Sequence, residues 1–326
     1  MSLRPSEDEL IARFFAPLAG PDGLGLRDDA ALMRPPPGED LVLTTDALVA
    51  GVHFFADDPP EAIARKALRV NLSDLAAKGA RPLGFLLSLV LPRDWKEDWL
   101  KAFAAALGAD ASVYHCPIIG GDTVATPGPL TVCITALGGV AAGRMVARTG
   151  VRAGDRIYVT GCIGDAAIGL ALRRGRGPEI PQAERAFLIE RYLTPEPRVA
   201  LAGVMSRHAN GGMDVSDGLV GDLTKLLSVS GVSARVPIFR LPLSLAARAA
   251  IAADPDLFAI AATGGDDYEL IASIARQSAS AFEAEAAAAG VPVTFIGEAI
   301  EGLGPPAFIG ADGDPVVFDR GSYSHF

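Results

Sequence analysis

The chain has 326 residues, enough for two domains of ordinary size or one large one. Its mean hydropathy is +0.30, but its apolar runs, such as 85–90, are strand-sized and too short to span a membrane. The net charge of −10 disfavours nucleic acid and anionic membranes as partners. It does not disfavour a phosphate substrate whose charge is neutralised by metal ions.

The three cysteines and the N-terminal segment bear on the compartment. Cys116, Cys133 and Cys162 form no C-x-x-C pair and leave an odd count, which fits a reducing compartment better than a disulfide framework. The charged start MSLRPSEDEL lacks the apolar core of a secretion signal. We therefore expect a cytoplasmic protein without a zinc site.

The first half of the chain alternates helical and strand-like segments. Ser6 and Glu9 have the spacing of a capping box and open a helix, and a Gly-rich stretch follows. Apolar periodicity then predicts a strand at 41–46, a helix at 60–78, a strand at 84–91, a helix at 95–110, a strand ending in 117–123 and a strand at 130–139.

A turn-like V-R-A-G-D segment at 151–155 marks a boundary near residue 150, so the predicted domains are 1–149 and 150–326. In the second half, the same patterns predict strands at 155–161, 268–274 and 293–298 and a strand-like segment at 234–239. They also predict helices at 183–192, 197–208 and 278–289, one helix after Gly164 and one after 213–219. This interleaving predicts a mixed α+β or α/β architecture.

Six short motifs place aspartate beside Gly, Ser, Thr or a second Asp, at the end of an apolar run or in a turn. They are RDDA at 27–30, TTD at 44–46, NLSD at 71–74, GGDT at 120–123, DVSDG at 214–218 and GGDD at 264–267. Carboxylate and hydroxyl oxygens are the ligands that Mg²⁺ prefers, and small neighbours allow close approach. The set therefore predicts a site that holds several Mg²⁺ ions against a polyphosphate.

Each motif alone also fits a purely structural role. Asp217 can cap the helix that follows, Asp222 can favour its N-terminal dipole, and Gly121-Asp122 is a common turn dipeptide. Asp74 is a stronger candidate, because its helix is apolar on two flanks and a buried carboxylate is costly unless it is paired or binds a metal. The competing explanation is an i,i+4 ion pair with Lys78.

Other signatures of nucleotide or covalent chemistry are missing from the sequence. There is no P-loop motif, and 161–164 lacks the pattern of a dinucleotide-binding turn. There is no G-x-S-x-G elbow or Cys/His nucleophile pair. Of the four histidines, His53 lies near a suspected site, and Arg148 fits either a phosphate clamp or an interdomain turn.

Taken together, the motifs resemble those of the thiamine-monophosphate kinase family. That family belongs to an ATP-binding superfamily with aminoimidazole ribonucleotide synthetase, selenophosphate synthetase and a hydrogenase maturation protein. The resemblance covers nearly the whole chain and rests on GLRDDAAL, TTDALVAGVHF, KALRVNLSDLAAKGARP, IIGGDT, MDVSDGL and GGDDYEL in this order.

The resemblance implies an N-terminal α+β domain with a dimer-forming mixed sheet. It also implies a C-terminal α/β domain of the aminoimidazole ribonucleotide synthetase type, which completes the nucleotide and substrate site. By similarity, the magnesium ligands are Asp29, Thr44, Thr45, Asp46, Asp74, Asp122, Asp214 and Asp217. The ATP contacts are Gly121, Asp122, Arg148 and Ser216, and the thiamine phosphate contacts are His53, Asp266 and Tyr323.

Two positions depart from the family pattern. Asp266 stands where the family usually has the longer glutamate, and Arg27 stands where a glycine is typical. The resemblance implies a homodimer that transfers a phosphoryl group from ATP to thiamine monophosphate, with Mg²⁺ and with a K⁺ requirement left open. Two alternatives are another ATP-using enzyme of the superfamily and a non-catalytic Mg²⁺–nucleotide-binding regulator. The first cysteine, Cys116, lies too far along the chain for the selenophosphate synthetase pattern.

Overall fold

The structure is a computed structural model that describes residues 6–319 and 321–322. By its internal contacts the chain divides into two compact units. The first comprises residues 1–75 and 81–143, and the second comprises 76–80 and 144–326.

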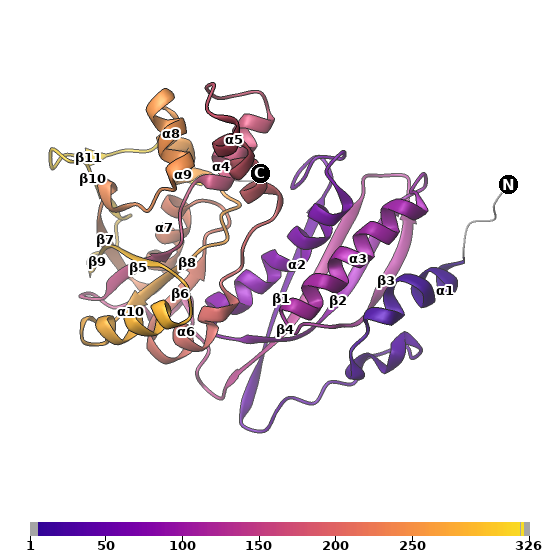
Figure 1. Cartoon of the computed structure of the whole chain (residues 1–326). Coiled ribbons are helices and arrows are strands. Elements are labelled where there is room, and N and C mark those ends of the chain that lie inside the picture. Colours follow the sequence, from indigo (N-terminus) through magenta and orange to yellow (C-terminus); the bar gives the residue numbers. More distant parts are fainter. Residues whose placement is uncertain (1–5, 320, 323–326) are drawn as a thin grey trace. The chain divides into compact units, whose positions relative to one another are not determined.

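The first unit is built on a four-stranded mixed sheet with the strand order β1-β4-β2-β3 (Figure 1). Strand β4 pairs antiparallel with both β1 and β2, whereas β2 and β3 are parallel. The elements of this unit are α1 (Glu7–Leu10), β1 (Glu39–Val49), α2 (Pro60–Ala77), β2 (Arg81–Pro92), α3 (Glu97–Val113), β3 (Ile118–Thr126) and β4 (Thr131–Ala141).

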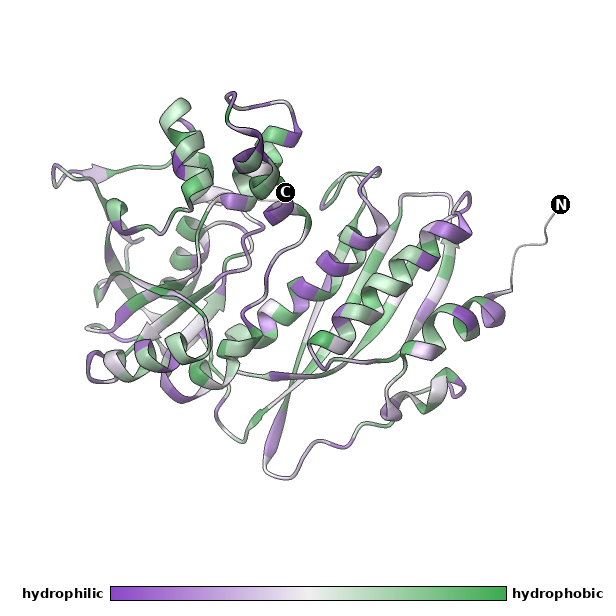
Figure 2. Cartoon of the chain, in the orientation of Figure 1, coloured by the Kyte–Doolittle hydropathy of each residue, from purple (hydrophilic) through white to green (hydrophobic). Residues whose placement is uncertain are grey.

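The helices α2 and α3 cover one face of this sheet (Figure 1). Along β2, Phe85, Leu87 and Leu89 are buried, while Leu86 and Ser88 between them are exposed, as the two-residue period of a strand requires. Figure 2 shows mainly hydrophobic strands behind helices that carry both polar and apolar residues. We call the other side of the sheet the open face. It carries Leu43, Thr45, Ala47, Leu86, Ser88, Asp122, Val124, Cys133 and Thr135.

The second unit contains a seven-stranded sheet with the order β11-β10-β7-β9-β5-β8-β6. Its neighbouring strands are antiparallel except for the parallel pair β7 and β10. The strands are β5 (Arg156–Thr160), β6 (Ala209–Asp214), β7 (Val232–Pro237), β8 (Leu270–Ile274), β9 (Val293–Glu301), β10 (Ala307–Ile309) and β11 (Pro315–Val316). The helices are α4 (Asp165–Arg173), α5 (Gln182–Leu193), α6 (Ala202–His208), α7 (Leu219–Ser230), α8 (Leu245–Ala253), α9 (Leu257–Thr263) and α10 (Ala279–Ala288).

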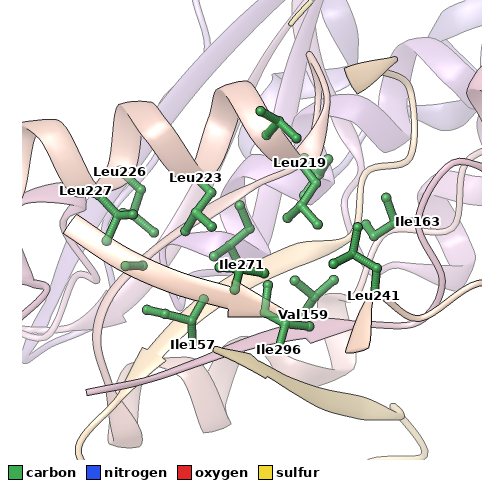
Figure 3. Packing of buried hydrophobic residues seen from close by; sticks show 14 of the residues in the cluster. Ile157, Val159, Ile163, Leu219, Leu223, Leu226, Leu227, Leu241, Ile271 and Ile296 are labelled. Atoms are coloured by element: carbon green, nitrogen blue, oxygen red, sulfur yellow. The ribbon is translucent and has the colours of Figure 1, made fainter. Parts of the chain in front are cut away.

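Two apolar clusters hold helices to this sheet. In the first, Leu219 and Leu223 of α7 pack toward Val159, Ile271 and Ile296 of the strands (Figure 3). In the second, α6 and α10 contribute Met205, Phe282 and further buried residues, packed with Tyr158 and Ile274. A third cluster joins α4, α5, α8 and α9. The core therefore fixes the ends of β6 and α7, where one of the aspartate motifs lies.

The mixed two-domain α+β class predicted from the sequence is confirmed. Helices α2, α3, α5 and α10 lie within a few residues of their predicted ranges. The helix predicted at 197–208 begins as a 3₁₀ turn and becomes α-helical only at α6, and the first helix passes into a π-helical turn after Leu10. Helices α8 and α9 were not predicted. Among the described residues, no helix is long and apolar enough to cross a membrane.

Candidate functional site

A cavity of about 660 Å³ lies in the first unit, on the side of the open face. It is lined by Asp28 and Asp29 of the Gly-rich loop, by 120–123 of β3 and by Ser88 of β2, with apolar residues completing the wall. This volume lies within the range of small-ligand sites. The structure thus brings two of the six aspartate motifs together, although they are about ninety residues apart in the chain.

Glycines place the backbone at this cavity. A side chain on Gly121 would put its Cβ 1.9 Å from the Leu87 carbonyl oxygen, and Gly121 has φ +152°. The Gly-rich loop lies against the same strand, because the Gly20 N–H donates to the Ile118 carbonyl at 2.9 Å and a Cβ on Gly23 would come within 2.9 Å of the Ile119 carbonyl. These close approaches hold Asp28 and Asp29 beside β3.

The TTD and GGDT motifs lie inside strands β1 and β3, and not at strand ends as the sequence pattern suggested. The two-residue period therefore separates neighbours within the TTD motif. Thr44 and Asp46 face the helices, whereas Thr45 lies on the open face with its hydroxyl 2.9 Å from that of Thr135. Asp122 shares the open face with Thr45, so the ligands expected in this unit lie on both faces of the sheet.

The carboxylate of Asp74 pairs with a hydroxyl on the neighbouring strand. The Thr44 hydroxyl donates to Asp74 Oδ2 at 2.5 Å, which links β1 to α2. Helix α2 is buried along most of its length, as expected, but Asp74 itself is only half-buried. Lys78, the partner in the competing explanation, donates from its Nζ to the Gly212 carbonyl at 2.8 Å.

His53 is held within a tight turn that follows β1. The Val49 N–H donates to His53 Nδ1 at 3.0 Å, so the neutral ring carries its proton on Nε2. The buried ammonium of Lys66, only 2% exposed, donates to the His53 carbonyl at 3.1 Å. Two contacts from different elements therefore fix this turn.

In the second unit, the DVSDG motif joins the end of β6 to the start of α7. Asp214 is 4% exposed, while Ser216 and Asp217 are half-buried. Gly218 has φ +118°, and a Cβ there would lie 2.5 Å from the Thr263 backbone. Asp217 does not cap α7, since the N-cap position is Gly218 and carries no side-chain hydrogen bond.

Lys225 of α7 joins two aspartates of this region. Its ammonium donates to Asp217 Oδ2 at 2.5 Å and to Asp222 Oδ1 at 2.9 Å. Asp222 also accepts the Asp217 N–H, and its side chain is 0% exposed. Burial raises the pKa of Asp222, and the bond from Lys225 opposes that rise. Burial lowers the pKa of Lys225, but its two carboxylate partners outweigh burial and leave it raised. Lys225 was not among the predicted site residues, although its i,i+3 spacing from Asp222 is visible in the sequence.

The GGDDYEL segment runs antiparallel beside the DVSDG motif. The Asp266 N–H donates to the Ser216 carbonyl and the Tyr268 N–H to the Val215 carbonyl, both at 2.9 Å. A Cβ on Gly265 would lie 2.0 Å from the Ser216 carbonyl oxygen. The backbone of Asp266 therefore lies directly against Ser216, so these two predicted contacts are neighbours.

Asp266 has φ +73°, a left-handed conformation that Asp adopts more readily than longer side chains do. This gives a physical reason for the shorter residue at this position. The other departure, Arg27, is exposed and has φ −116°, which any L residue adopts, so its backbone does not require glycine.

Alternate residues of the same segment point into the interior. Asp267 is 3% exposed and accepts the Gly164 N–H at 2.7 Å, near the start of α4. Burial raises the pKa of Asp267 well above its ordinary value, and nearby Asp165 and Glu269 add to the rise. Glu269 is fully buried and pairs with Arg198 and Arg191. Nothing in the sequence distinguished these anchors from the ligand candidate Asp266.

Two further predicted contacts have different outcomes. Arg148 is exposed on a 3₁₀ turn, where its carbonyl accepts the Ser230 hydroxyl at 2.7 Å. Tyr323 lies outside the described residues.

The donor chemistry of both units fits a hard divalent cation. Around the cavity the polar side chains are carboxylates and hydroxyls, with no histidine or cysteine among the lining residues. In the second unit Asp217 already holds a cation, the ammonium of Lys225. Among residues 6–319 and 321–322, no three His, Cys, Asp or Glu side chains converge closely enough to hold a metal ion.

Comparison with known proteins assigns both halves of the chain. The model of the AIR synthase related protein, N-terminal domain, matches residues 27–140, and that of the C-terminal domain matches residues 152–305. A thiamine-monophosphate kinase of Caulobacter vibrioides is 44% identical over 309 residues, covering 93% of this chain and 87% of the relative. The enzyme of the same name from Salmonella typhimurium is 40% identical, with 98% of each chain covered.

Solved structures agree with these matches. Thiamine-monophosphate kinase from Stenotrophomonas maltophilia superposes with a TM-score of 0.83 at 38% identity, covering 95% of this chain and 96% of that one. The AaThiL complex with AMPPCP and TMP gives 0.78 at 31% identity, covering 90% and 89%. The hydrogenase maturation protein HypE in complex with ATP gives 0.78 at 20% identity and shares the fold. The chain belongs to the thiamine-monophosphate kinase family, within the AIR synthase related proteins.

Proposed function

We propose that this chain transfers the γ-phosphoryl group of ATP directly to the phosphate of thiamine monophosphate, giving thiamine diphosphate and ADP with the help of magnesium ions. The activity follows from family membership, which includes a relative 44% identical over 93% of the chain. A relative in complex with both AMPPCP, an ATP analogue, and TMP supports the substrate pair. The observation in this chain that carries the proposal is the cavity in the first unit. Asp28 and Asp29 line this cavity together with Gly121 and Asp122 of β3.

The chemistry of the acceptor fits the residues at hand. A phosphate monoester presents an anionic oxygen as nucleophile, so its attack needs no strong general base. Catalysis then rests on positioning the two phosphates and on neutralising their charge. A site rich in aspartate and poor in His, Cys and Lys suits this task. Burial raises the pKa of the Cys116 thiol to about 12, which keeps it protonated and unreactive.

Magnesium would supply charge neutralisation between the phosphates. Mg²⁺ is usually held by one or two carboxylates together with substrate phosphates and waters, so small groups of aspartates suffice. We assign as its ligands Asp29, Thr44, Thr45, Asp46, Asp74, Asp122, Asp214 and Asp217. The backbone at Gly121, with Asp122, Arg148 and Ser216, would contact the nucleotide.

For the acceptor we assign His53, Asp266 and Tyr323. His53 offers an Nε2 proton in the tautomer that its turn selects, which suits a donor to a phosphate oxygen. Asp266 lies against Ser216, so the acceptor and nucleotide contacts of the second unit adjoin. The free cysteines suit a cytoplasmic setting.

A homodimer formed through the open face accounts for its apolar character. Leu43 is 62% exposed and Val124 is 45% exposed in the single chain, and an apolar patch of this kind marks an association surface. The cavity shares residues Leu86 and Thr135 with the open face. Pairing of two copies would therefore close a wall of the cavity.

The proposal is tested by measuring ADP release from Mg²⁺–ATP with and without thiamine monophosphate. The kinase releases ADP only with the acceptor. An enzyme for another acceptor shows no dependence on thiamine monophosphate, and a regulator binds nucleotide without turnover. Either of the last two results would overturn the assignment.

A further inference from the structure

Lys225 occupies a position that the proposed function gives to a metal ion. Its ammonium lies 2.5 Å from Asp217 Oδ2, and Asp217 is one of the assigned magnesium ligands. The same ammonium lies 2.9 Å from Asp222 Oδ1. One lysine thus bridges a candidate ligand and a carboxylate that has no assigned role in the reaction.

The two ends of this bridge differ in their exposure. The Asp222 side chain is 0% exposed and the Asp217 side chain is 35% exposed. A buried carboxylate that loses its cation is left with a large desolvation cost, so the bond from Lys225 to Asp222 is the permanent one. A pair in contact with water is worth only a fraction of this, so the bond to Asp217 is the exchangeable one.

A local hydrogen bond and the geometry of α7 hold Asp217, Asp222 and Lys225 in position. Asp222 Oδ2 accepts the Asp217 N–H at 2.9 Å, which fixes the main chain of Asp217. Helix α7 places Lys225 one turn beyond Asp222, on the same side. Of these three residues, the side chain of Asp217 is therefore the one that can change its partner.

We propose that Lys225 is a positioning residue that holds Asp217 in the metal-free protein and competes with the divalent cation for its carboxylate. This inference rests on the proposed function, because it assumes that Asp217 binds metal. Asp217 leaves Lys225 when the cation arrives, while Lys225 stays on Asp222. Occupation of this ligand is then an exchange of one cation for another.

Direct binding of Mn²⁺, used as a probe for Mg²⁺ and measured by the electron paramagnetic resonance of the free ion, tests this without any turnover. Lys225→Met removes the competitor, so Mn²⁺ affinity should rise about two- to fivefold, the range expected for a partly exposed ion pair. Lys225→Arg introduces a guanidinium that can form two hydrogen bonds with the Asp217 carboxylate and so binds it more tightly. Mn²⁺ affinity should therefore fall. The matched control Lys101→Met removes an exposed lysine of α3 and should leave affinity unchanged.

A lysine with a merely structural role would give a different result, because both substitutions at 225 would then weaken Mn²⁺ binding. That outcome, or equal affinity in Lys225→Met and the unmodified protein, overturns the proposal. If Lys225→Met does not fold, Lys225→Arg still decides, since unchanged or increased affinity contradicts competition. Failure of the kinase assignment would show instead as absent acceptor-dependent ADP release, with this Mn²⁺ response intact.

Discussion

The Thr44 hydroxyl donates a 2.5 Å hydrogen bond to Asp74 Oδ2, so one oxygen of this carboxylate is oriented by the strand beside it. Both residues belong to the assigned magnesium ligands. The bond links strand β1 to the last turn of helix α2. It uses Oδ2 of Asp74 and not Oδ1. The orientation of Asp74 therefore depends on a hydroxyl at position 44.

Removing either partner should impair turnover more than stability. Asp74→Asn removes a charge that would neutralise phosphate, so we expect turnover to fall about 100-fold or more with an unchanged far-ultraviolet circular dichroism spectrum. Thr44→Val should also slow turnover, whereas Thr44→Ser keeps the hydroxyl and should stay close to the unmodified rate. Near-normal turnover in Asp74→Asn would refute its assignment as a ligand.

Adjacent glycines of β3 should respond differently to alanine. Gly121→Ala puts a Cβ against the Leu87 carbonyl at a positive φ, so we expect a loss of about 2–4 kcal/mol in the free energy of unfolding. In Gly120→Ala the nearest atom is the flexible end of Leu86 at 3.0 Å, and the cost should be about 1 kcal/mol or less. Urea denaturation measures both, and equal losses would contradict the close approach at Gly121.

The buried Asp267 should make stability depend on pH. Its folded pKa is raised above the ordinary value of 3.8, so its contribution is complete below that pH and is lost as pH rises toward the folded pKa. Asn does not titrate and keeps an acceptor for the Gly164 N–H. The stability of Asp267→Asn relative to the unmodified protein should therefore rise between pH 5 and 7, by at most about 1.4 kcal/mol per pH unit.

Denaturant unfolding at both pH values gives this difference directly. The exposed Asp57 provides the control, since Asp57→Asn should show a much smaller change with pH. A stability difference for Asp267→Asn that is the same at both pH values would show that the buried carboxyl titrates alike in the folded and unfolded chains.

The proposed dimer depends on the open face of the first sheet. Light scattering should give twice the chain mass of 33.7 kDa for the unmodified protein. Leu43→Lys places a charge on this face, on the edge strand β1, and should give a monomer. Leu245→Lys, at a position 85% exposed on α8, is the matched control and should remain dimeric. A Leu43→Lys dimer would place the interface elsewhere.

Long periodic segments were the predictable part of the fold. Helix α2 and strand β2 have long, regular apolar patterns, and both were predicted to within three residues of their bounds. Helices α8 and α9 were missed because they are short, at 9 and 7 residues, and they are held by packing within one helical cluster. Tertiary contacts therefore decided what periodicity left open.

The site was predictable as a set of motifs but not in its arrangement. The motif order led to the family, whereas the position of Thr45 and Asp122 on the face opposite Thr44 depends on strand register. In GGDDYEL, Asp266 is a candidate ligand contact, whereas Asp267 and Glu269 are buried anchors. This difference depends on residues with a left-handed backbone conformation, which the composition does not reveal. Lys225 was overlooked because lysine is not a metal ligand.

The most direct test of the proposed kinase activity is the identity of the product. Purified protein should be incubated with Mg²⁺, ATP and thiamine monophosphate, and the mixture followed by ³¹P nuclear magnetic resonance. If the chain is the proposed kinase, the monoester signal of thiamine monophosphate is replaced by the two coupled signals of a diphosphate, in equal amount to the ADP formed. Formation of inorganic phosphate in place of the diphosphate, or an unchanged monoester signal, would contradict it.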